Sequence, residues 1–205
     1  MAKWACELGA FDIEFRARTA IKSQALVDFV AEWTEQQVPP NPEKPEHWKI
    51  YFDGSLKLEG AGAGVLFISP TGQQLKYVLH ILFQVSNNAA EYEALLHGIR
   101  IIVSLGIQYL MVYGDSSVVI NQVNKDWNCT SEKVNAYCVE MRKQEGKFRG
   151  IEFHHVARDF NVAADVLSKI ASSRASVPVG IFIQEISKPS IEESEMVFSA
   201  TLRKG

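Results

Sequence analysis

Four acidic residues stand where an expected secondary-structure element begins or ends. Asp53 and Asp115 each close an apolar run, while Glu91 and Asp165 fall in the first turns of two expected helices. Each has an ordinary explanation, because acids are favoured in turns, at helix N-caps and in first helical turns. Gathered in one place, however, they would repel one another unless a cation lay between them. Since hard divalent cations prefer oxygen ligands, the set predicts a site for one or two Mg²⁺ ions.

A pair of such ions suggests a particular reaction. Two Mg²⁺ ions held roughly 4 Å apart can activate a water on one side of a phosphodiester and stabilise the leaving oxygen on the other. This hydrolysis requires no covalent nucleophile from the protein. The acids can support it only if elements far apart in the sequence bring them to one end of a sheet.

The patterns between the acids predict those elements. Strands are expected at 47–55, 61–69, 73–85, 107–115 and 150–158, and helices at 87–106, 116–127, 131–148 and 161–173. Short connections make the first three strands antiparallel. The order predicts an α/β fold with a mixed five-stranded sheet, three antiparallel strands followed by two parallel ones, flanked by helices. Gly106 is expected to end the long helix, and Asn161 to cap the last one.

Composition limits the classes of function. The 205 residues are 47% hydrophobic and carry a net charge of -3, which suits one buried domain with flanking segments. This charge gives no global attraction to a polyanion, so nucleic-acid binding would need a local basic surface. Three cysteines without a C-x-x-C pair fit reduced thiols in an intracellular protein. No stretch approaches the roughly 18 apolar residues of a membrane span.

Four short motifs resemble a known family. In chain order, IYFDGS, NNAAEYEALLHGI, VYGDSSVVINQV and HHVARDFNVAADVLSKIA resemble the motifs of type 1 ribonuclease H, and more closely those of plant LTR (gypsy-type) retrotransposon polyproteins. The resemblance implies a ribonuclease H-like fold and an endonuclease that cuts the RNA strand of RNA/DNA hybrids. It implies two Mg²⁺ ions, with Mn²⁺ able to substitute. The family's catalytic, metal-binding acids map onto Asp53, Glu91, Asp115 and Asp165.

The resemblance also implies a mobile catalytic histidine that helps water or product to move. Ungapped counting from Asp165 places it at His155. His155 can equally be a packed strand residue, and relatives with an arginine in that role make Arg158 a rival.

Substrate contacts follow from the same resemblance. The expected contacts are Gly54, Ser55, Ser86, Asn87, Asn88, Arg158 and Asn161. The family distinguishes the RNA strand near the metal ions, where contacts to 2′-hydroxyls separate RNA from DNA. The sequence LKLEGAGAG replaces the Gly-Asn-Pro-Gly turn of many relatives, and the basic residues are scattered among acids. Hybrid binding is therefore expected to be weak and sensitive to salt.

The flanks extend the resemblance to a polyprotein. The chain divides into the tail of an upstream, degraded ribonuclease H-like or connection unit (1–34), a Pro-rich linker (35–46), the ribonuclease H domain (47–174) and a C-terminal linker or tail (175–205). Reverse transcriptase and integrase regions of the parent polyprotein are the implied partners. Two alternatives remain: a catalytically weak or inactive nucleic-acid-binding remnant of the same fold, and a nuclease of this fold with another substrate.

Overall fold

The computed structural model describes residues 47–129 and 131–191. The units predicted at 1–34 and 35–46 lie outside the described residues, and the division of the chain into four units stays a prediction. Within the described part, no helix combines the length and the apolar character that crossing a membrane requires.

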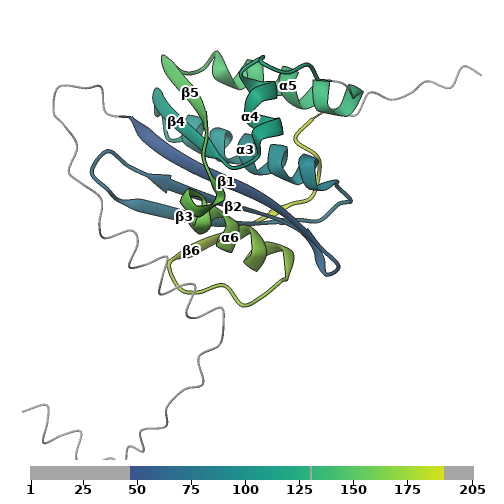
Figure 1. Ribbon diagram of the computed structural model, residues 1–205. Helices are drawn as coiled ribbons and strands as arrows, with labels where there is room; N and C mark the ends of the chain where they lie inside the picture. Colours follow the sequence, from purple (N-terminus) through teal and green to yellow (C-terminus); the bar gives the residue numbers. More distant parts are fainter. Residues whose placement is uncertain (1–46, 130, 192–205) are drawn as a thin grey trace, which may run out of the picture.

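The described chain forms one sheet with helices on both faces (Figure 1). The strands are β1 (Trp48–Lys57), β2 (Gly60–Ile68), β3 (Gln74–Ile81), β4 (Tyr109–Gly114), β5 (Gly150–His155) and β6 (Ile181–Ile186). The helices are α3 (Asn87–Ser104), α4 (Ser117–Val123), α5 (Glu132–Glu145), the short 3₁₀ turn η1 (Arg158–Phe160) and α6 (Val162–Ser172). This confirms the mixed α/β fold with antiparallel strands followed by parallel ones.

The strand order is β5-β4-β1-β2-β3-β6. β1 is antiparallel to β2 and parallel to β4, and Phe52 of β1 lies opposite Gly114, the last residue of β4. Asp53, the next residue of β1, therefore lies beside Asp115, the residue that directly follows β4. The expected neighbourhood of these two strands is confirmed.

The prediction of five strands was wrong, because β6 pairs in parallel with β3 and makes a sixth. β6 is an edge strand, and four of its six residues are exposed. An edge strand needs no strongly apolar pattern, because it pairs with a single neighbouring strand and buries few of its side chains. The segment after α6 consequently reads in the sequence as a tail without a clear element.

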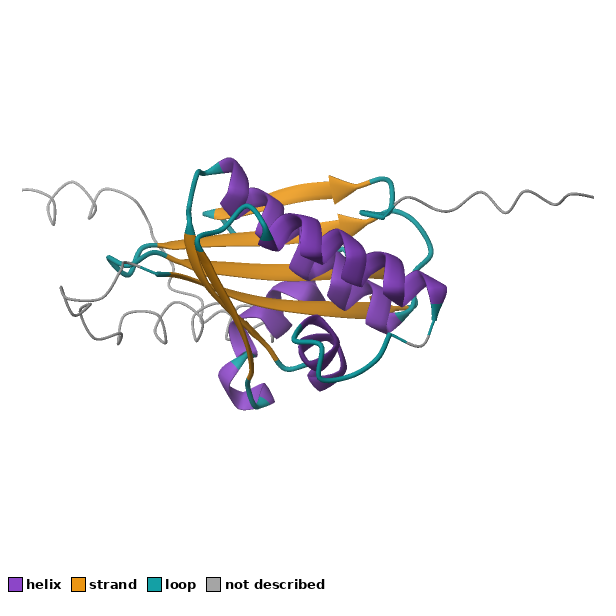
Figure 2. Ribbon diagram, turned by 90° about the horizontal axis from the view of Figure 1, so that it is seen from above, coloured by secondary structure: helices purple, strands orange, loops and turns teal. Residues whose placement is uncertain are grey.

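Two apolar clusters lie on opposite faces of the sheet. Alternate residues of β2 divide between them, as the period of two along a strand requires. Val65 and Phe67 belong to the cluster beneath α3, and Leu66 and Ile68 to the cluster beneath α6. Figure 1 shows α3, α4 and α5 on one side of the sheet and α6 on the other. Seen from above, helices lie across the strands (Figure 2).

Glycines let the helices approach the sheet closely. A Cβ added to Gly54 of β1 would lie 2.3 Å from the backbone nitrogen of Glu91 in α3. A Cβ added to Gly64 of β2 would lie 2.3 Å from the backbone oxygen of Ala164 in α6. Since backbone atoms cannot move aside as a flexible side chain can, glycine is required for this packing. The close approach brings the acids of α3 and α6 to the central strands.

After β6 the chain returns to α3. The Ser190 N–H donates a hydrogen bond to Glu93 Oε1 over 2.9 Å, and Arg100 donates to the backbone oxygen of Ser190 over 2.8 Å. Ile191 is buried in the cluster beneath α3. Residues 187–191 thus fasten the end of the described chain to the outer side of this helix.

Candidate active site

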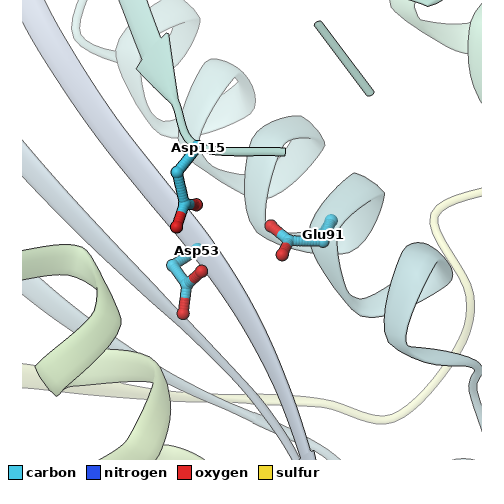
Figure 3. A group of neighbouring side chains, drawn as sticks. All are labelled: Asp53, Glu91 and Asp115. Atoms are coloured by element: carbon cyan, nitrogen blue, oxygen red, sulfur yellow. The ribbon is translucent and has the colours of Figure 1, made fainter. Parts of the chain in front are cut away.

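Three carboxylates converge where β4 ends beside the middle of β1, and the expectation that Asp53 closes its strand was wrong, because pairing with β2 carries β1 on to Lys57. Asp53 comes from β1, Glu91 from α3, and Asp115 directly follows β4. Each offers an oxygen atom, and these oxygens all lie within 4.8 Å of one another. Figure 3 shows the three side chains pointing toward a common space. An all-oxygen donor set at this spacing fits a hard divalent cation such as Mg²⁺.

The helix that carries Glu91 begins at Asn87, the first residue of the expected helix. The Ser86 hydroxyl is the N-cap and accepts from the Ala89 N–H over 3.2 Å. Glu91 is the fifth residue of α3, beyond its first turn, and the expected placement in that turn was wrong. Its Oε2 accepts a hydrogen bond from the Gly54 N–H over 2.9 Å. Gly106 follows the end of the helix with φ +73°, as predicted for its terminating glycine.

Burial and mutual repulsion act on the carboxylates. Burial raises the pKa of Glu91 to about 9, and the negative charges of Asp53 and Asp115 add to this, against the Gly54 hydrogen bond. Burial also raises the pKa of Asp53 to about 7, opposed by a hydrogen bond from Ser168 and reinforced by the charges of Asp115 and Asp165. A bound cation would relieve the cost of ionising these groups.

Asp165 lies in the first turn of α6, as predicted, but outside the close group of three. Its Oδ1 accepts from Arg158 Nη2 over 3.0 Å, and its Oδ2 accepts from Lys169 Nζ over 2.5 Å. It lines the same cleft as the other three acids, a hollow of about 320 Å³. Two side-chain cations therefore hold Asp165 at the edge of the cluster.

Asn161 and Ser168 fix two of the acids. Asn161 stands at the N-cap position of α6, as predicted, but its side chain makes no capping hydrogen bond. Its Nδ2 donates instead to the Phe52 backbone oxygen over 2.9 Å and to Asp115 Oδ1 over 3.0 Å. The Ser168 hydroxyl donates to Asp53 Oδ2. The last helix thus cross-links the middle of β1 to Asp115 at the end of β4.

The two candidates for the mobile group both border Asp115. His155 is the exposed last residue of β5, and its Nε2 donates to the Asp115 backbone oxygen over 3.2 Å. Arg158 lies in η1, and its Nε is 4.0 Å from Asp115 Oδ2. Arg158 lines the cleft and contacts two carboxylates through its guanidinium group.

Only some of the expected substrate contacts line the cleft. Gly54, Ser55 and Asn87 line it, whereas Ser86 and Asn88 do not. The hydroxyl of Ser55 accepts from Ser172 of α6 over 3.1 Å. Beyond Lys57, where the Gly-Asn-Pro-Gly turn of many relatives was expected to be replaced, the chain makes a tight two-residue turn between β1 and β2.

Sequence reasoning missed Ser168 and Lys169. Signals for both were present: Lys169 follows Asp165 by four residues, which places the two on one face of a helix. Ser168 is a polar residue inside an otherwise apolar helical pattern, and it is fully buried against Asp53.

Residues 51–171 match the family model described as reverse transcriptase-like. The chain belongs to the reverse transcriptase-like family. The match begins within β1, ends within α6 and contains all four acids of the cleft, and it excludes β6.

Known relatives of this reverse transcriptase-like chain include ribonucleases H. The uncharacterized protein YpeP of Bacillus subtilis is 31% identical over 137 residues, which cover 62% of this chain and 59% of YpeP. The chain therefore spans less than two thirds of YpeP. Ribonuclease HI of Halobacterium salinarum is 23% identical over 171 residues, 82% of each chain.

Solved structures agree with this relationship. The crystal structure of RNase H1 from Halobacterium salinarum has a TM-score of 0.57 and 25% identity, covering 63% of this chain and 99% of that one. LC11-RNase H1, isolated from compost and solved in complex with an RNA/DNA hybrid, shares the fold with a TM-score of 0.54 and 21% identity, covering 62% of this chain and 97% of that one. The described chain is an RNase H-like domain.

Stabilisation by Mg²⁺ is expected to grow with pH. The pKa values of Asp53 and Glu91, about 7 and about 9, lie above ordinary carboxyl values near 4. The ion-free protein should therefore lose unfolding free energy as pH rises from about 4 through these values, because buried carboxyls must ionise. Bound Mg²⁺ requires the ionised form and releases protons. Melting curves at pH 6 and pH 9, with Mg²⁺ or EDTA, should show the larger Mg²⁺-dependent rise in Tm at pH 9.

A Glu91→Gln variant is the control for this pH dependence. It should show a smaller change of Tm with pH in EDTA. An equal Mg²⁺ effect at both pH values in the unmodified protein would contradict the expectation.

Proposed function

We propose that the protein is a Mg²⁺-dependent endonuclease that hydrolyses the RNA strand of RNA/DNA hybrids. The observation that carries the proposal is the convergence of Asp53, Glu91 and Asp115, with a carboxylate oxygen of each within 4.8 Å of the others, on the central strands of an RNase H-like domain. Relatives named ribonuclease HI and RNase H1 support it.

The four acids would hold the ions, with Asp165 joining the close group as a further ligand. Bound Mg²⁺ supplies Lewis acidity and a water of lowered pKa. The chain's own residues prepare the site. Ser168 and Asn161 orient Asp53 and Asp115, and the Gly54 N–H orients Glu91. Arg158 stands beside two carboxylates, where it can contact a phosphate that enters the cleft.

The substrate class rests on the polar groups at the cleft wall. Ser55 and Asn87 line the cleft next to the acids and offer a hydroxyl and an amide to a 2′-hydroxyl. The net charge of -3 and the tight turn after Lys57 leave few basic contacts for the remaining length of the hybrid. Binding should therefore weaken steeply with added salt.

The origin we propose is a gypsy-type retrotransposon polyprotein of plants. The support is the motif resemblance in the sequence and the reverse transcriptase-like family match over residues 51–171. Residues 1–34 would then be the tail of an upstream ribonuclease H-like unit, followed by a linker at 35–46. Reverse transcriptase and integrase regions of the same polyprotein would be partners.

One cleavage assay tests the activity. The full chain is incubated with labelled RNA/DNA hybrid, double-stranded RNA and duplex DNA, each in Mg²⁺ and in EDTA. We expect loss of the RNA strand from the hybrid alone, in Mg²⁺ alone, with 3′-hydroxyl and 5′-phosphate ends. Cleavage of duplex DNA would select a nuclease of the same fold with another substrate.

A second candidate is a nucleic-acid-binding remnant with little or no catalysis. The pairing of Asp165 with both Arg158 and Lys169 favours it, because two cations already satisfy a carboxylate that a second ion would need. In the same assay this candidate would bind the hybrid without cutting it.

Lys169 is expected to compete with a cation at Asp165. Its ammonium group is half-exposed and 2.5 Å from Asp165 Oδ2, so Lys169→Met removes a positive charge from the edge of the cluster. An exposed pair of this kind contributes up to about 1 kcal/mol, which corresponds to about fivefold in affinity. Titration calorimetry of the ion-free protein should therefore show Mg²⁺ binding about twofold to fivefold tighter in Lys169→Met.

The matched control is Lys143→Met. Lys143 also pairs with an acid, Glu140, but on α5 and away from the cleft, so Mg²⁺ affinity should not change. Weaker binding in Lys169→Met would show that Lys169 supports the site rather than competing for it.

A further inference from the structure

Two cysteine thiols face each other behind α3, outside the carboxylate cleft. Cys129 lies in the segment between α4 and α5, and Cys138 lies in the middle of α5. Their Sγ atoms are 2.6 Å apart, about half an ångström longer than a disulfide bond. The sequence predicted reduced thiols without an evident partner, whereas the fold places these two together.

We propose that Cys129 and Cys138 are an oxidation site, at which a peroxide converts the pair to an intramolecular disulfide. The inference is independent of the proposed nuclease activity.

A reagent can reach the pair. Both cysteines line a hollow of about 430 Å³, whose wall also includes Trp127 and Arg142. Cys129 is half-buried, and Cys138 is buried with 6% of its surface exposed. Burial raises the pKa of the Cys138 thiol to about 11, and the thiol of Cys129 adds to this. Cys129 is therefore the group placed to react first, because the thiolate is the nucleophile and needs access to the oxidant.

The chemistry balances with hydrogen peroxide as the oxidant. The Cys129 thiolate attacks one peroxide oxygen, the O–O bond breaks, and with proton transfer the products are a sulfenic acid and water. The Cys138 sulfur, losing its proton, then attacks the Cys129 sulfur, and the S–O bond breaks to release a second water. Two thiols have lost two electrons, and one peroxide has been reduced to two waters.

The disulfide would link elements of the helical layer on this face of the sheet. Cys138 Sγ lies 3.6 Å from the Tyr92 hydroxyl, which donates to Gln122 of α4 over 2.8 Å. Gln122 Nε2 in turn donates to the backbone oxygen of Asn128, beside Cys129, over 3.4 Å. The pair thus sits where α3, α4 and α5 meet. A disulfide there would restrict the segment between α4 and α5.

The experiment uses the full chain with Cys6→Ser, so that two thiols remain. After treatment with hydrogen peroxide, thiol titration should fall from two to none, and peptide mapping should show residues 129 and 138 linked within one chain. A disulfide between residues 129 and 138 restricts the unfolded chain, so Tm should rise by about 5 to 10 °C. Dithiothreitol should reverse the change.

Matched variants separate the proposal from simple damage. Cys129→Ser and Cys138→Ser, in the same background, should each keep the Tm of the reduced protein after peroxide and show no internal link. The proposal is overturned if both thiols of the parent protein stay free to alkylating reagent, if links form between chains instead, or if the two cysteines are oxidised separately to sulfinic acids.

Discussion

Replacing Asp53 by asparagine is expected to lower the rate of RNA cleavage in a hybrid by about 1,000-fold or more. Asp53 belongs to the close group and accepts from Ser168 of α6, and Asp115 and Asp165 both lie near enough to affect its pKa. Asparagine keeps the shape and removes the charge that would bind the ions. Metal ions contribute several kcal/mol of transition-state stabilisation, and each 1.4 kcal/mol is about tenfold in rate.

The rate should be measured with labelled hybrid at saturating Mg²⁺, together with hybrid affinity in EDTA. Asp126→Asn is the matched control, because this exposed acid lies after α4 and outside the cleft. Removing a buried charge should also raise the Tm of ion-free Asp53→Asn at pH 9, which would show that the variant is folded. Cleavage at the unmodified rate would exclude Asp53 from the catalytic site.

Replacing Gly64 by alanine should destabilise the fold by about 2 to 3 kcal/mol. The new Cβ would lie 2.3 Å from the Ala164 backbone oxygen and 2.4 Å from the Ser168 backbone nitrogen. Forcing atoms into a packed site costs typically 1 to 3 kcal/mol, and here α6 itself must move. Urea unfolding followed by circular dichroism measures the loss.

Gly146→Ala is the matched control for this packing prediction. Gly146 ends α5 with φ -60°, and the nearest atom to an added Cβ is 3.8 Å away, so stability should change by less than about 1 kcal/mol. If Gly64→Ala were as stable as the control, α6 would not be pressed against β2. Because Ser168 and Asp165 both lie on α6, a displaced helix should also weaken Mg²⁺ binding.

Much of the fold follows from local patterns in the sequence. The apolar runs around Ile50 and Val112 predict central strands. The helical pattern of α3 is followed by Gly106, and this glycine predicts where the helix ends. Once these strands are neighbours, the placement of Asp53 beside Asp115 follows from the pairing alone. The meeting of Asp53 and Asp115 is therefore predictable from the amino-acid sequence.

Other features depend on contacts that no local pattern records. The Asn161 amide looks like a helix cap in the sequence, yet it donates to Phe52 and Asp115, more than 40 residues away. The pairing of Asp165 with Arg158 requires the turn η1, which no apolar periodicity predicts. β6 is held by one neighbouring strand and by the return of the chain to α3, so its short, exposed sequence carries little signal.

The return of residues 187–191 to α3 bears on where the folding unit ends. Glu93 is fully buried, and the Ser190 N–H and the Tyr137 hydroxyl both donate to its Oε1. A recombinant version cut after residue 174 would keep every acid of the cleft. It would, however, expose the outer edge of β3 and remove the Ser190 N–H that donates to the buried Glu93 carboxylate. Protease trimming or expression trials should accordingly place the stable C-terminal boundary beyond Ile191, some way past the last residue that matches the family.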